Sequence, residues 1–104
     1  MNISDLASGL GLDEPTTKKL LGTFLTATNS DLGELKDAVQ AGELSRVSEL
    51  AHHIKGAAAN LELETIRQAA YDLEMTAKGG ALNDADTAVT TIDKGLTQLR
   101  AQLT

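Results

Sequence analysis

The chain has 104 residues with 9 basic and 15 acidic side chains, a formal net charge of −6 and no cysteine. This length suits one domain with a single core over residues 1–104. An acidic chain without a Lys/Arg cluster is a poor partner for nucleic acid or an anionic membrane, and the lack of cysteine excludes disulfides and thiolate metal sites.

The N-terminal segment predicts a short helix rather than a targeting signal. It lacks the basic and long apolar regions of a signal peptide, and no later run approaches the roughly 20 apolar residues of a membrane span. We therefore expect a cytoplasmic protein. Ile3 and Leu10 lie on one side of a predicted helix over residues 3–10, with Ser4 as its cap. Met1 and the absence of a linker favour a stand-alone protein.

A long helix is predicted next, over about residues 16–41. Asp13-Glu14-Pro15 is typical of a helix start, and Gly42 ends the pattern. The apolar phase continues through the polar segment at residues 29–33, which favours one helix over two. The residues on this stripe are Leu20, Leu21, Phe24, Leu25, Leu32, Leu35, Ala38 and Val39.

Three further amphipathic helices complete the pattern. The turn at Gly42 is short, so helix 44–61 folds back on the long helix. The next helix ends at Gly79-Gly80, and the last is predicted to begin with Asn83 as its cap and Asp86 in an imperfect capping box. Their stripes are Leu44, Val47, Leu50, Ala51, Ile54, Ala58 and Leu61, then Leu63, Ile66, Ala70, Leu73 and Ala77, then Ala85, Ala88, Val89, Ile92, Leu96, Leu99 and Leu103. We predict an all-α fold, an antiparallel up-down-up-down four-helix bundle with a short extra N-terminal helix.

The face of helix 44–61 that lies away from its apolar stripe is unusually flat. At about 100° per residue, one imidazole stands there among hydroxymethyl groups, methyl groups and bare backbone. The residues on this face are Ser45, Ser48, His52, Gly56 and Ala59.

Three interpretations of His52 stay open on the residues alone. An exposed histidine is most often a solvated surface residue. A metal ligand is disfavoured because the adjacent His52 and His53 diverge by about 100°, and Glu74 or Asp72 would have to complete the site from another helix. The third interpretation is a nucleophile, since a neutral imidazole attacks phosphorus well near neutral pH.

The neighbours of His52 favour the nucleophile. Lys55, three residues on, can reach phosphoryl oxygens and compensate their charge. Gly56, four residues on, removes the side chain that would shield the imidazole. A Gly in the middle of a helix lowers helix stability by about 1 kcal/mol relative to Ala. The need for a partner to approach closely would explain why Gly is present here. His53 points toward bulky polar neighbours and is interpreted as a solvated surface residue.

The segment AHHIKGAAANL, residues 51–61, resembles the signature of histidine-containing phosphotransfer (HPt) domains. That signature is a His, two residues, Lys-Gly, and small residues leading to Leu. The resemblance extends in outline over the whole chain. It implies that His52 is the phosphoacceptor, that Lys55 compensates the phosphoryl charge and that Gly56 gives the partner access.

Two positions depart from the family pattern. Ala57 stands where Ser or Thr is frequent, and Glu62 stands where many members have Gly after the Leu. Glu62 affects how the helix ends and touches no chemistry.

The resemblance implies a phosphorelay intermediate, a phosphocarrier rather than an autonomous kinase. The chain has no Gly-rich phosphate loop and no acids arranged for Mg²⁺, so it is expected to bind no cofactor. A partner receiver would then supply the aspartyl phosphate and the Mg²⁺. The implied partners are response-regulator receiver domains and a hybrid sensor histidine kinase, which a monomer would dock through Ser45, Ser48, Glu49 and Ala59. The alternative is a silent homologue that docks a receiver or kinase without phosphotransfer.

Overall fold

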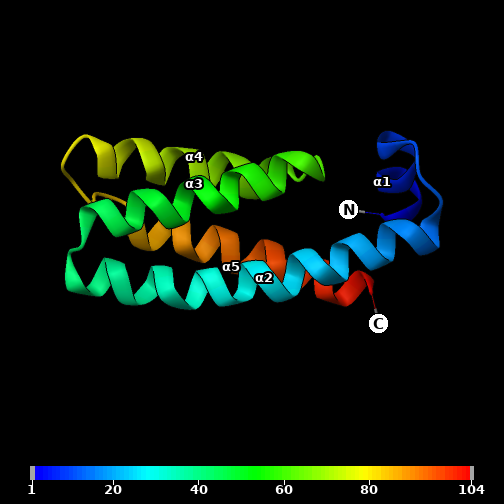
Figure 1. The fold of residues 1–104 in the computed structure, drawn as a ribbon, viewed down its shortest axis with the longest axis horizontal. Helices are drawn as coiled ribbons and strands as arrows, with labels where there is room; N and C mark the ends of the chain where they lie inside the picture. The colour runs from blue at the N-terminus through cyan, green and yellow to red at the C-terminus, as the bar shows by residue number, and fades with distance from the viewer. Residues whose placement is uncertain (1, 104) are drawn as a thin grey trace.

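The computed structural model describes residues 2–103, which form five α-helices and no strand (Figure 1). The helices are α1 (Ile3–Leu10), α2 (Glu14–Ala41), α3 (Leu44–Asn60), α4 (Glu64–Lys78) and α5 (Ala85–Gln102). The predicted all-α bundle is confirmed, and the long helix is continuous as expected. None of the helices within residues 2–103 is both long and apolar enough to cross a membrane.

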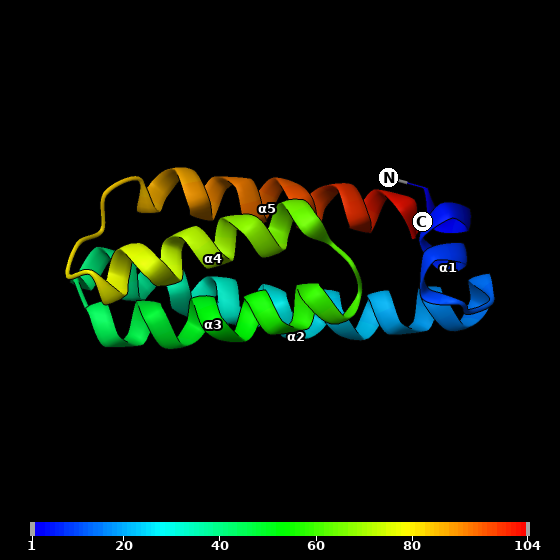
Figure 2. The ribbon, with the colours of Figure 1, turned by 90° about the horizontal axis from the view of Figure 1, so that it is seen from above.

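Helices α2 to α5 lie lengthwise beside one another in a body of 42 × 21 × 17 Å. Each packs against two neighbours, in the pairs α2/α3, α3/α4, α4/α5 and α2/α5. The colours in Figure 1 show that the chain runs one way along α2, returns along α3, and reverses again for α4 and for α5. Figure 2 shows α1 at one end of the bundle, where it packs on the start of α2.

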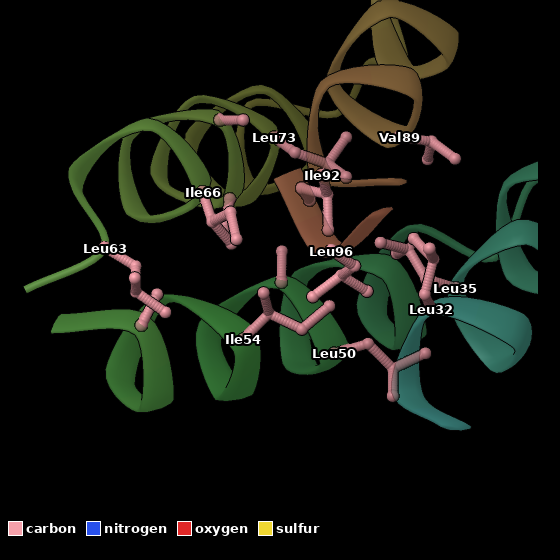
Figure 3. Close-up of a cluster of buried hydrophobic side chains, with 14 of the residues drawn as sticks. Leu32, Leu35, Leu50, Ile54, Leu63, Ile66, Leu73, Val89, Ile92 and Leu96 are labelled. Atoms are coloured by element: carbon pink, nitrogen blue, oxygen red, sulfur yellow. The ribbon is translucent and has the colours of Figure 1, made fainter. Parts of the chain in front are cut away.

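The core lies between the four long helices and is built from the apolar stripes read in the sequence. Figure 3 shows side chains from all four helices converging on one centre. The labelled residues are Leu32, Leu35, Leu50, Ile54, Leu63, Ile66, Leu73, Val89, Ile92 and Leu96. Leu20 is the exception on the predicted stripe of α2, because it is 41% exposed. It lies about 100° around the helix from the fully buried Leu21, away from the core.

Two predicted helix caps are wrong. The cap of α1 is Asn2 rather than Ser4: the Asn2 Oδ1 atom accepts a hydrogen bond of 2.7 Å from the Ser4 backbone N–H. Helix α5 begins after Asp84, whose φ of 61° is left-handed and whose side chain makes no capping bond, so Asn83 does not cap it. The predicted start at Asp13 is confirmed, since its carboxylate accepts a 2.7 Å bond from the Thr16 N–H.

Gly95 of α5 lets α4 pack closely against it. A Cβ atom at this position would lie 2.7 and 2.9 Å from two side-chain carbons of Ile66 on α4. Gly33 in the middle of α2 has nothing within 4 Å of such an atom. Glycine is therefore required by packing at the first position and not at the second.

We predict that Gly95→Ala lowers the melting temperature while Gly33→Ala raises it. Both substitutions gain about 0.5–1 kcal/mol from reduced backbone entropy, but overpacking Ile66 costs about 1–3 kcal/mol. Thermal unfolding followed by circular dichroism measures both variants. Equal stabilisation by the two substitutions would contradict the close contact between α4 and α5.

Candidate functional site

His52 projects from α3 into solvent, as its helical phase predicts. Its side chain is 64% exposed, whereas its neighbours Ala51 and Ile54 are fully buried. The predicted flat face is also on the outside: Ser45, Gly56 and Ala59 are exposed, and Ser48 is half-buried.

Glu74 of α4 lies beside His52 and is the centre of a charged cluster. Only 1% of its side chain is exposed. Its Oε2 atom is 3.0 Å from His52 Nδ1 and 2.9 Å from Lys78 Nζ, and its Oε1 atom is 2.8 Å from Lys55 Nζ. One buried carboxylate thus contacts three basic side chains from two helices, a group that we call the Glu74 cluster.

The contacts of Glu74 decide its protonation state. Burial raises the pKa of this carboxyl group, but hydrogen bonds from Lys55, Lys78 and His52 outweigh burial and lower the pKa to about 2. Glu74 is therefore ionised at neutral pH and can only accept hydrogen bonds. It follows that Nδ1 of His52 carries a proton and donates a hydrogen bond to Glu74. The lone pair of a neutral imidazole then lies on the outer nitrogen, Nε2.

Lys55 has two partners in the structure. Its ammonium group contacts Glu74 and lies 5.7 Å from the centre of the Tyr71 ring, a cation–π distance. Its side chain is 26% exposed, so this lysine is held against α4 rather than extended into solvent. The expected contact of Lys55 with a phosphoryl group stays a prediction.

Gly56 leaves open space beside His52. A Cβ atom there would meet nothing within 4 Å, so the fold does not require glycine at this position. Gly22 and Gly33 of α2 share this property, and the position of Gly56 one turn after His52 is what distinguishes it. Its predicted role in partner access rests on that position.

The remaining predicted residues lie apart from the Glu74 cluster. Glu49 is exposed and pairs with Arg46, which also pairs with Glu34 of α2. His53 is exposed, and within residues 2–103 its side chain makes no hydrogen bond or ion pair. No group of three metal-binding side chains occurs in residues 2–103, and the ammonium groups of Lys55 and Lys78 beside Glu74 disfavour a metal cation there.

Sequence reasoning missed Glu74 and Lys78 as members of the site. The sequence offers Glu74 as a possible metal ligand and as part of the outline resemblance to HPt domains, with no role beside His52, and it gives Lys78 no role. One signal was available: Glu74 lies between Ala70 and Ala77 on the edge of a buried stripe, four residues before Lys78. The spacing within α4 does not tell which residue of α3 Glu74 faces, because that depends on how the two helices are rotated and aligned.

Comparison with known protein families identifies the family of the chain. The profile of the Hpt domain family matches residues 19–102, which is most of the chain and includes the whole Glu74 cluster. The chain belongs to the Hpt domain family. No curated protein and no solved structure matches it.

Membership in this family fixes the broad biological role. Hpt domains are helical bundles that work with response-regulator receivers in two-component phosphorelays. The matched region of this Hpt domain covers α3, α4, α5 and most of α2, and it leaves out α1. The family resemblance predicted from residues 51–61 is confirmed.

The Glu74 cluster predicts a specific acid sensitivity. Because the pKa of Glu74 is lowered on folding, the stability that it contributes is complete above about pH 4.5 and is lost as the pH falls toward about 2. Glu74→Gln should lower the free energy of unfolding at pH 7 by about 1–3 kcal/mol and flatten its loss between pH 5 and 2. Urea unfolding at several pH values measures both effects.

Glu49→Gln is the matched control, because it makes the same change at an exposed carboxylate of α3. It should change stability by less than about 1 kcal/mol. The assignment fails if Glu74→Gln leaves the pH profile of the parent protein unaltered.

Proposed function

We propose that this Hpt domain accepts a phosphoryl group on His52 from the aspartate of a receiver domain and passes it to another receiver. The observation that carries the proposal is the contact between His52 Nδ1 and the buried, ionised Glu74. This contact leaves the lone pair of the neutral ring on Nε2, the nitrogen farther from Glu74, in a side chain that is 64% exposed.

The transfer step needs no proton movement within this chain. The Nε2 lone pair attacks the phosphorus of the receiver's aspartyl phosphate, a P–N bond forms, and the electrons of the broken P–O bond return to the receiver's carboxylate. Nδ1 keeps its proton, so the phosphorylated ring is an imidazolium. Its positive charge lies against Glu74, which stabilises it. Onward transfer to a second receiver reverses these steps.

The partner supplies the rest of the machinery. A receiver would bring the Mg²⁺ and the aspartyl phosphate, and a hybrid sensor histidine kinase is the proposed source of the phosphoryl group. We propose that a monomeric, antiparallel four-helix bundle displays His52 and that the partner docks over Ser45, Ser48, Glu49, Gly56 and Ala59. Such an interface should be small and short-lived, because each partner leaves after transfer.

The alternative function is docking without transfer, as a silent member of the family. Binding alone would use the exposed face of α3 and would gain nothing from a buried carboxylate that orients His52. The Glu74 contact therefore favours transfer over docking alone.

We predict that His52→Gln abolishes the uptake of acid-labile phosphate from a panel of ³²P-phosphorylated receivers. His53→Gln, the matched control on the same helix, should take up label at the rate of the parent protein. The reason is that His52 has an oriented ring and His53 has no such partner. The label is followed by gel electrophoresis and its site by mass spectrometry.

Two outcomes would contradict the proposal. Undiminished labelling of the His52→Gln variant would place the phosphoryl group elsewhere. Binding of a phosphorylated receiver by the parent protein without any transfer would identify the silent alternative.

A further inference from the structure

Lys78 is the least explained member of the Glu74 cluster. It is the last residue of α4, and its ammonium group lies 2.9 Å from the Glu74 Oε2 atom. The Nδ1 atom of His52 contacts that same oxygen at 3.0 Å. Lys78 and His52 therefore share one carboxylate oxygen, although Lys78 is 26 residues away in the chain and outside the HPt signature.

The two lysines of the cluster are held differently. Lys55 contacts the Oε1 atom of Glu74 and the Tyr71 ring, and its side chain is 26% exposed. Lys78 has Glu74 as its only ion-pair partner within the described chain, and its side chain is 57% exposed. Lys78 is the more exposed of the two lysines, and Glu74 still contacts Lys55 and His52 when Lys78 turns to another anion.

The charges of the cluster also leave room for an anion. Glu74 supplies one negative charge, while Lys55 and Lys78 supply two positive charges. With His52 neutral, the cluster carries one excess positive charge in a chain whose net charge is −6. Only one carbon separates the two ring nitrogens of an imidazole, so a phosphoryl group on Nε2 adds its negative charge close to Nδ1, the atom that shares a Glu74 oxygen with Lys78.

We propose that Lys78 is a second phosphoryl-binding cation, which leaves Glu74 and pairs with the phosphoryl oxygens once His52 is phosphorylated. This inference rests on the proposed function of His52. Lys55 then keeps Glu74 compensated, and Glu74 keeps its bond to the protonated Nδ1. Lys78 forms and breaks no covalent bond; it stabilises the charge of the transferred group.

The test compares Lys78→Gln, Lys78→Arg and the parent protein, each phosphorylated by the same receiver and then separated from it. Titration by ³¹P NMR measures the pKa of the phosphoryl group on His52. We expect Lys78→Gln to raise this pKa by about half a unit, because a nearby cation favours the dianion. The initial rate of transfer should fall about threefold. Lys78→Arg, which keeps the cation, should restore both values.

Lys94→Gln is the matched control, since it removes one exposed lysine from α5, outside the cluster. It should leave the phosphoryl pKa unchanged. An unchanged pKa in Lys78→Gln, with the parent phosphorylated on His52, overturns the role of Lys78 and leaves the proposed function intact. A parent protein that no receiver phosphorylates on His52 overturns both.

Discussion

The site depends on one interaction, the contact between a buried carboxylate and an exposed imidazole. A carboxylate with 1% exposure loses its hydration, which is costly unless charged partners replace the water. Three basic side chains provide that replacement for Glu74, and each is fixed in return. Because the carboxylate remains ionised, it acts only as an acceptor, and this property sets the proton on one nitrogen of His52.

The packing of α3 against α4 brings the residues of the Glu74 cluster into contact. His52 and Lys55 come from α3, whereas Glu74 and Lys78 come from α4. The two helices are joined by a short turn in which Glu62 has a left-handed φ of 57°, a conformation that glycine adopts without strain. Glutamate at this position therefore carries backbone strain that glycine would not.

Much of the architecture is predictable from the sequence because it follows from helix periodicity. The apolar stripes identify the four long helices, and the phase of α3 correctly places His52 outside and Ile54 inside. The errors concern local chemistry. Asn2 rather than Ser4 caps α1, and α5 starts without the expected cap from Asn83. Leu20 has the right period but is 41% exposed.

The sequence predicts the site residues on α3 but not those on α4. The Lys55-Gly56 pair can be predicted from the sequence because it lies three and four residues after His52 on the same helix. Glu74 and Lys78 approach from another helix, and their distances to His52 depend on the rotation and alignment of two packed helices. A buried glutamate and a lysine at a helix end look ordinary until the position of α3 is known.

We propose that Glu74 holds the proton of His52 on Nδ1 and leaves Nε2 as the nucleophile. The most direct test is the ¹⁵N NMR spectrum of the His52 ring at a pH where the imidazole is neutral, assigned by comparison with His52→Gln. We expect a protonated Nδ1 and an unprotonated Nε2, with the proton shifting away from Nδ1 in Glu74→Gln. A proton found on Nε2 in the parent protein would contradict it.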